Sequence, residues 1–156
     1  MSETSELAEK LKSEGEKVVT FFSEFRAGDW EREVYTEDTT WTVRNILSHL
    51  VTSERGLIKL FERIRHGGEG AALDFSIDRY NASMQAKNKD LTEAELLNQY
   101  QEVRANSIIW VSNLKEDELE ITGRHPFLGV TTIREMIKML YIHNQTHSRD
   151  MKKALK

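Results

Sequence analysis

The sequence predicts an all-α protein: a four-helix bundle with a short extra helix between the second and third long helices. Two observations support this class. One proline occurs in 156 residues, and apolar side chains recur with the 3.6-residue helical period through four long segments. Because no repeat, low-complexity tract or linker interrupts the pattern, a single domain is expected over residues 1–156.

The first two long helices are defined by their apolar faces. The first is expected over roughly residues 3–26, and Gly28 breaks its pattern. The second is expected from Thr42, whose hydroxyl can cap the helix while Trp41 packs outside it, to about Arg65. The glycine-rich stretch 66–70 then interrupts it. The core residues of these helices are expected to be Leu7, Leu11, Val18, Phe22 and Phe25, then Val43, Ile46, Leu47, Leu50, Val51, Leu57, Ile58, Phe61 and Ile64.

The remaining helices follow from their start signals. A short helix is expected over roughly residues 77–87. Capping boxes at Thr92 with Glu95 and at Thr132 with Glu135 predict the start of the third and fourth long helices. Between these two helices, the glycines and His125-Pro126 predict an irregular connection, since a residue before proline avoids helical geometry. Helix three should bury Leu96, Tyr100, Val103, Trp110, Val111 and Leu114.

Composition excludes several classes of function. The net charge of -4 offers no attraction to phosphate backbones, and no apolar run approaches the roughly 18 residues that span a bilayer, so neither nucleic acid nor a membrane is expected as a partner. The absence of cysteine excludes a disulfide scaffold, a thiolate nucleophile and Cys-ligated zinc. The acidic, polar start differs from a signal peptide, so a cytoplasmic location is expected.

Three histidines are the candidate metal ligands. His143 and His147 lie on the apolar face of the last helix, and a spacing of four places their β-carbons about 6 Å apart, within reach of one ion. Burying two unpaired imidazoles would cost about 1 to 3 kcal/mol each, which a shared metal would offset. His49 lies at the edge of the second helix's core face, where a histidine is more often a satisfied polar residue than a ligand. Nevertheless, with few residues after His147, it is the best candidate for a third ligand.

Other residues receive weaker predictions. Ser53 and Gly56 follow His49 along the same face and are candidate substrate-binding residues, because a glycine there could leave a cavity; simple helix packing is the alternative. His125 could approach the pocket from its loop, but it is expected to be exposed. Residues expected to have structural or solvated roles are Trp41, Arg44, His66 and Arg149.

The segment 143–147 can be compared with the zinc-protease pattern His-Glu-x-x-His. The glutamate that serves as general base there is replaced by Asn144, which cannot take a proton. Peptide hydrolysis by that route is therefore disfavoured.

The string Trp41-Thr42-Val43-Arg44-Asn45-Ile46-Leu47-Ser48-His49-Leu50 resembles the signature helix of the DinB-like (DinB/YfiT) superfamily of four-helix-bundle metalloproteins. The segment 78–81 resembles its Asp-x-Trp-Asn segment, with Tyr80 in place of tryptophan. The stretch from His125-Pro126 to the histidine pair resembles its closing unit. The resemblance spans roughly residues 5–155.

This resemblance implies that His49, His143 and His147 bind a divalent metal, such as Zn, Ni or Fe, with open coordination positions. Relatives include transferases that attach bacillithiol or a similar thiol to electrophiles and a mycothiol-dependent isomerase, and family members are often dimers. The expected function is therefore a metal-dependent transferase with a low-molecular-weight thiol as cosubstrate, acting on a small molecule as a possible homodimer. A stress-response protein that binds a metal or small ligand without turnover, or a metal-free interaction module, are the alternatives.

Overall fold

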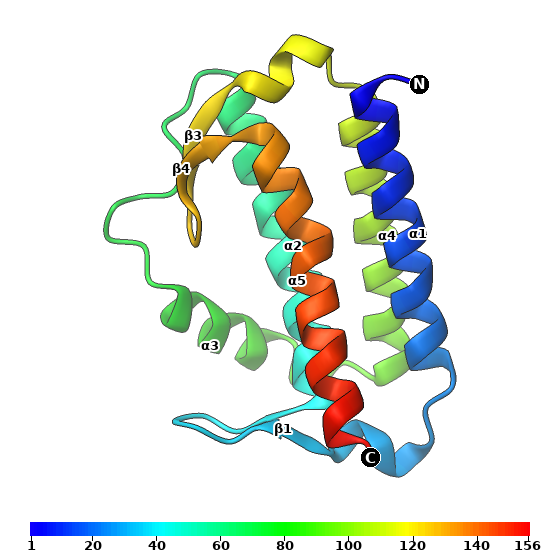
Figure 1. Ribbon diagram of the computed structural model, residues 1–156. Coiled ribbons are helices and arrows are strands. Elements are labelled where there is room, and N and C mark those ends of the chain that lie inside the picture. The colour runs from blue at the N-terminus through cyan, green and yellow to red at the C-terminus, as the bar shows by residue number, and fades with distance from the viewer.

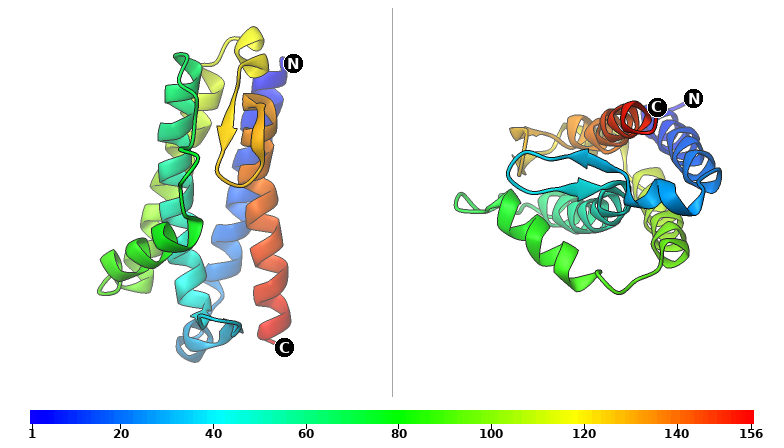
Figure 2. Two further views of the ribbon diagram at one scale, coloured as in Figure 1. Left: turned by 90° about the vertical axis from the view of Figure 1, so that its left-hand side faces the viewer. Right: turned by 90° about the horizontal axis from the view of Figure 1, so that it is seen from below.

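The computed structural model describes all of residues 1–156 and contains a bundle of four long helices (Figure 1). These helices are α1 (Glu3–Ser23), α2 (Val43–Arg65), α4 (Glu93–Ser112) and α5 (Ile133–Ala154). The view along the bundle shows them around a common core, with the shorter α3 (Ile77–Lys87) outside it (Figure 2). The predicted fold class is therefore confirmed, including the extra helix.

The order of helices around the bundle explains why α3 exists. Both α1 and α2 pack against α4 and α5, so α1 and α2 occupy diagonal positions. In Figure 1, α2 and α4 run in the same direction, so the chain must travel back along the bundle between them. Residues 66–92 make this return, and α3 forms part of it. No residue of α3 is fully buried, which makes it the helix least embedded in the fold.

Two short hairpins form where irregular connections were predicted. After the 3₁₀ turn Ala27–Glu31, β1 (Glu33–Tyr35) pairs antiparallel with β2 (Trp41–Thr42). After the turn Glu116–Glu120, β3 (Thr122–His125) pairs with β4 (Gly129–Thr132), which leads directly into α5. Gly129 has a φ of 78°, which favours glycine at this turn. The β3–β4 hairpin extends from the end of the bundle back along α2 and α5 (Figure 1).

The helix starts agree with the predicted caps in part. The hydroxyls of Thr42, Thr92 and Thr132 each accept a hydrogen bond from the backbone amide three residues later. The reciprocal bond of a full capping box forms only at Thr42, where the Asn45 side chain accepts from the Thr42 amide at 2.8 Å. The first helix ends at Ser23 rather than near residue 26, and Phe25 instead stacks into an aromatic cluster with Phe22 and Trp30.

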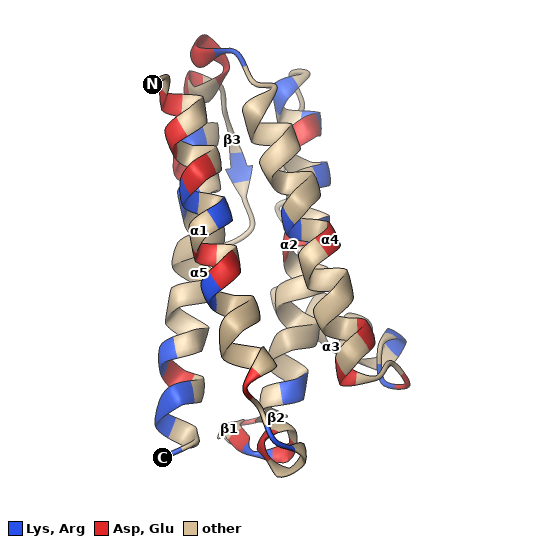
Figure 3. Ribbon diagram, turned by 90° about the vertical axis from the view of Figure 1, so that its right-hand side faces the viewer, with Lys and Arg blue, Asp and Glu red and all other residues tan.

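The core consists of two apolar clusters separated by polar side chains. One cluster packs the half of the bundle that contains Leu11, Phe61 and Met136, and the other packs the half that contains Phe22, Leu47 and Met151. Between them lie buried polar residues that we call the polar layer: Glu54, Tyr100, Arg104, Ser107 and Asn144. Outside, positive and negative side chains are interleaved over the bundle (Figure 3), and none of the helices has the length and apolar character needed to cross a membrane.

Candidate metal centre

The three predicted ligands meet at one point between α2 and α5. The Nε2 atom of His143 lies 3.0 Å from Nε2 of His49 and 2.9 Å from Nε2 of His147. All three ligand atoms lie within 4.8 Å of one another. His143 and His147 reach the point together because they are one helical turn apart on α5, and His49 faces them from the adjacent, antiparallel α2.

Burial keeps these imidazoles neutral. The pKa of His49 is lowered to about 2, first by burial and then by the charges of His143 and His147, while the side chain of Asn81 opposes this. Burial likewise lowers the pKa of His147 to about 4, with His143 adding to the effect and Asp150 opposing it. The pKa of His143 is also lowered by burial, against the opposing charge of Glu54. At neutral pH all three residues are therefore in the unprotonated form that binds metals.

The donor set fits a divalent metal ion. Three neutral nitrogen atoms converge, and no carboxylate belongs to the cluster. The Nδ1 atom of His49 is buried and has no hydrogen-bond partner, and the hydrogen-bond contact of the ring is from Nε2 to His143. Three imidazole donors suit zinc and several first-row transition metals, and leave coordination positions for other ligands.

Asn144 has no role at the ligand atoms, because its side chain belongs to the polar layer. Its Oδ1 accepts hydrogen bonds from the Tyr100 hydroxyl at 2.6 Å and from Arg104 Nη2 at 2.7 Å. Arg104 also forms a bidentate ion pair with Glu54, through Nε at 2.9 Å and Nη2 at 2.7 Å. The residue that stands where the zinc proteases have a general base thus fixes α5 against α4 instead.

His147 has two further polar neighbours that the sequence did not suggest. Its Nδ1 lies 2.9 Å from the Tyr35 hydroxyl, which donates to Oδ2 of Asp150 at 2.5 Å. Burial, followed by the hydrogen bond to Asp150, raises the pKa of Tyr35, so the hydroxyl stays protonated at neutral pH. Asp150 could have been found from its place one turn after His147. Tyr35 could not, since it lies on the β1–β2 hairpin, which no helical period predicts.

The space beside Gly56 is filled, which corrects the expected cavity at that position. A β-carbon on Gly56 would lie 2.7 Å from the hydroxyl oxygen of Tyr80 on α3. This hydroxyl donates to the carbonyl oxygen of Thr52 at 2.9 Å. Gly56 therefore admits Tyr80 and lets α3 dock on α2. Ser53 is half-buried on the same face, and its part in substrate binding, like that of Gly56, stays a prediction.

Two expectations of solvent exposure are wrong. His125 is only 4% exposed, because the β3–β4 hairpin folds onto the bundle and places its ring near Phe61. Its Nδ1 accepts two backbone N–H groups, from Phe127 and Leu128, each at 3.1 Å, so the ring hydrogen is on Nε2, which has no partner. Arg44 caps the end of α3, where its Nη2 donates to the carbonyl oxygens of Asn88 at 3.1 Å and of Leu91.

The other weaker predictions agree with the structure. Trp41 packs at the start of α2 with its ring centroid 5.0 Å from that of His49. His66 is exposed at the end of α2 and contacts Glu62 at 2.8 Å. The Arg149 side chain is 65% exposed.

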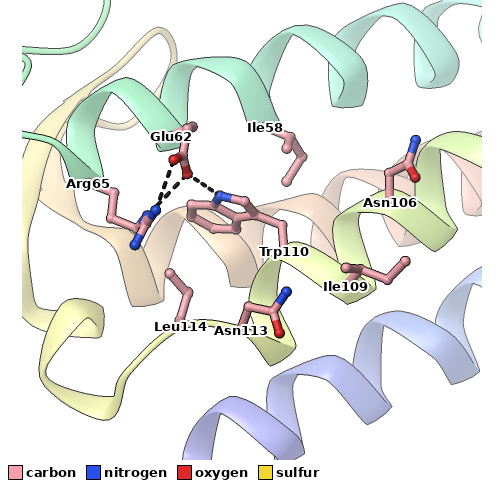
Figure 4. A pocket seen from close by; sticks show the side chains of 8 residues that line it. All are labelled: Ile58, Glu62, Arg65, Asn106, Ile109, Trp110, Asn113 and Leu114. Atoms are coloured by element: carbon pink, nitrogen blue, oxygen red, sulfur yellow. Dashed lines mark hydrogen bonds and ion pairs between the residues drawn. The ribbon is translucent and has the colours of Figure 1, made fainter.

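Two surface pockets have none of the three histidines in their lining. One, of about 370 Å³, is a groove between α2 and α4, where Glu62 accepts hydrogen bonds from Arg65 and Trp110 (Figure 4). The other, of about 410 Å³, is lined by Tyr35 and Asp150 together with Glu33, Val34, Lys153 and Ala154. It therefore borders the two polar neighbours of His147, while His147 itself is not part of its lining.

The fold and the site together define the class of this protein: it is a four-helix bundle in which three histidines form a candidate metal site. The sequence model of the DinB superfamily matches residues 17–151, and the chain belongs to this family.

Solved structures agree at the level of the fold. YfiT from Bacillus subtilis, described as a probable metal-dependent hydrolase with an unusual four-helix bundle topology, superposes with a TM-score of 0.78 at 16% identity, over 99% of this chain and 87% of that one. The sibling lethal factor precursor DfsB superposes with a TM-score of 0.73 at 14% identity, over 98% and 95% of the two chains. No curated protein matches the sequence.

Proposed function

We propose that the protein is a divalent-metal-dependent enzyme that transfers a small thiol to an electrophilic small molecule. The observation that carries this proposal is the convergence of three neutral Nε2 atoms without any carboxylate. A divalent cation held there keeps its full charge and lowers the pKa of a thiol or water molecule that enters its open positions.

The polar groups around the site favour a thiol over water as the nucleophile. An unperturbed thiol has a pKa of about 8.5, whereas bulk water has a pKa of about 15.7. A thiol therefore needs no general base to become ionised beside a cation, while water activation benefits from one. The two carboxylates whose charges act on His143 and His147 are engaged elsewhere: Glu54 pairs with Arg104, and Asp150 accepts from Tyr35.

Hydrolysis is the second candidate function. It is supported by the fold shared with YfiT, which is itself described as a probable metal-dependent hydrolase. In a hydrolase the same three histidines would hold the cation, and water would take the place of the thiol. A stress-response protein that holds a metal or a small ligand without turnover remains the non-enzymatic alternative.

The first test is the metal content of protein purified without an affinity tag. We expect about one equivalent of a divalent metal by elemental analysis, and its loss in His147→Ala. His66→Ala is the matched control, since His66 is exposed at the end of α2 and contacts only Glu62 and Arg65. Wild-type protein without metal, or His147→Ala with full metal, would contradict the three-histidine site.

The second test separates the functions. Monochlorobimane and several low-molecular-weight thiols are offered to the metal-loaded protein, and conjugation is followed by fluorescence. We expect a metal-dependent rate with at least one thiol, abolished in His147→Ala and kept in His66→Ala. Metal-dependent hydrolysis of ester or amide substrates without any conjugation would favour the hydrolase instead, and neither activity would favour the binding protein.

A further inference from the structure

His147 differs from the other two ligands in what its second ring nitrogen contacts. The Nδ1 atom of His147 lies 2.9 Å from the Tyr35 hydroxyl, which in turn donates to Asp150 at 2.5 Å. The Nδ1 atom of His49 is buried without a partner. His143 forms its hydrogen bonds through Nε2 only. One ligand of the three is thus connected to a chain of further polar side chains.

The fold brings the side chains of His147, Asp150 and Tyr35 together from two distant segments. Asp150 follows His147 by three residues, so both side chains emerge on the same side of α5. Tyr35 is the last residue of β1, and this strand packs against α5. The Asp150 side chain is 28% exposed and borders the 410 Å³ pocket. The hydrogen bonds from His147 through Tyr35 to Asp150 therefore reach the protein surface.

The direction of the hydrogen bonds follows from which groups can donate. An ionised carboxylate only accepts, so the Tyr35 hydroxyl must give its hydrogen to Asp150. The hydroxyl oxygen is then left with lone pairs, and His147 must donate to it from Nδ1. With the ring hydrogen on Nδ1, the Nε2 atom of His147 keeps a free lone pair directed at His143 and His49.

We propose that Tyr35 and Asp150 are positioning residues that hold His147 in the Nδ1–H tautomer and orient its ring, so that Nε2 is prepared to bind the metal. The inference rests on the proposed metal site, because it concerns how one ligand of that site is prepared. Partners of this kind fix the tautomer and raise the basicity of a ligating histidine, and their loss typically weakens metal binding by about 10- to 100-fold.

Metal affinity tests the proposal in the full-length protein with Zn²⁺ and a competing chelator. Tyr35→Phe removes the hydroxyl and keeps the ring, and we expect the Kd for Zn²⁺ to rise by about 10- to 100-fold. Tyr141→Phe is the matched control, because Tyr141 lies on α5 itself and is also half-buried, but its hydroxyl forms no hydrogen bond. It should bind Zn²⁺ as the wild type does.

The tautomer of His147 can be measured without any metal. In protein labelled with ¹⁵N-histidine, long-range ¹H–¹⁵N spectra at pH 7.5 distinguish a hydrogen on Nδ1 from one on Nε2. We expect His147 to be the Nδ1–H tautomer in the wild type and in Tyr141→Phe, and a mixture in Tyr35→Phe. Asp150→Ala should shift it toward Nε2–H, because the freed Tyr35 hydroxyl would then donate to Nδ1.

The two measurements distinguish a failure of the positioning role from a failure of the proposed metal site. If the wild type binds Zn²⁺ but Tyr35→Phe keeps its Kd within about twofold and its tautomer, the positioning role is wrong and the metal site stands. If the wild type binds no Zn²⁺, the proposed function fails, and the tautomer spectra alone then decide the role of Tyr35 and Asp150. A purely structural role would lower the melting temperature and leave both the tautomer and the Kd unchanged.

Discussion

Asn144 follows His143, a proposed metal ligand, in the sequence, yet its side chain is 2% exposed and hydrogen-bonded within the core. Two donors from α4, the Tyr100 hydroxyl and the Arg104 guanidinium, bind its single Oδ1 atom. These bonds fix the rotation of α5 about its own axis. Because His143 and His147 are on the same helix, that rotation also determines where their rings face. The polar layer therefore orients the ligands without touching them.

At the residue scale, the ion pair of the polar layer gives a prediction about stability. Arg104 and Glu54 side chains are each 4% exposed, so Arg104→Met leaves a buried carboxylate without its partner. The free energy of unfolding should fall by about 3–5 kcal/mol. In the double variant Arg104→Met/Glu54→Leu, neither charge of the pair is left buried without its partner, and much of that loss should be recovered.

Urea unfolding of the two single variants and the double variant measures this coupling. Ser107 also donates to Glu54, at 2.8 Å, and one such bond is too weak to replace the guanidinium. If the double variant is no more stable than Arg104→Met, the loss of stability in Arg104→Met does not come from leaving the Glu54 carboxylate without its partner.

At the scale of the element, α3 docks on α2 through a close approach at Gly56 and through two hydrogen bonds between Gln85 and Asn45. A β-carbon on Gly56 would lie only 2.7 Å from the hydroxyl oxygen of Tyr80. It would lie 3.5 Å from the ring carbon that bears this hydroxyl, which is an ordinary contact distance. The clash in Gly56→Ala is therefore with the hydroxyl oxygen. We expect Gly56→Ala to loosen α3, and Gly56→Ala/Tyr80→Phe to restore its docking in large part.

Amide hydrogen exchange of residues 77–87 measures the docking of α3. Exchange should be faster in Gly56→Ala than in the wild type and slower again in the double variant, while α4 stays unchanged. Gly28→Ala serves as the control, since a β-carbon there has nothing within 4 Å. Equal exchange in Gly56→Ala and the wild type would mean that Tyr80 moves aside without consequence.

For the whole molecule, four histidines with lowered pKa values make stability depend on pH. The pKa of His49 is lowered to about 2 and those of His125 and His147 to about 4, in each case first by burial, and that of His143 is lowered as well. Below about pH 6.5 the unfolded chain binds protons that the folded chain does not. The free energy of unfolding of the metal-free protein therefore falls as the pH falls, by at most about 1.4 kcal/mol per pH unit for each histidine.

Unfolding at pH 7.5, 6.5 and 5.5 checks this dependence. The window lies above the range of the carboxylates whose pKa values are lowered, such as Glu62 and Glu118, which lose their contribution only at lower pH. Bound metal should make the free energy of unfolding fall more steeply as the pH falls, because protons compete with the metal for the same histidine nitrogens. A constant free energy of unfolding over this range would show that the histidines are accessible to protons in the folded state.

The helical period was sufficient to place His143 and His147 on an inward face, but it placed His49 only at the edge of the core face of its helix. The meeting of the three rings was therefore predicted from the period together with the family resemblance around His49. The partners of His147 and the burial of His125 depend on two hairpins of only a few residues each. Such short strands carry no periodic signal, and their packing on α5 is set by tertiary contacts. The pairing of Glu54 with Arg104 likewise depends on the relative register of two helices, which neither sequence segment specifies alone.

The ligands are distributed unevenly along the chain, and this affects when the site can form. His143 and His147 are four residues apart, whereas His49 is 94 residues from His143. A partly folded chain with a helical C-terminal segment already offers two donors, and the third arrives only when α2 docks on α5. The difference in metal affinity between the two-donor and three-donor states equals, by linkage, the free energy that the metal adds to this docking. Metal titration thus measures the assembly of the bundle as well as the occupancy of its site.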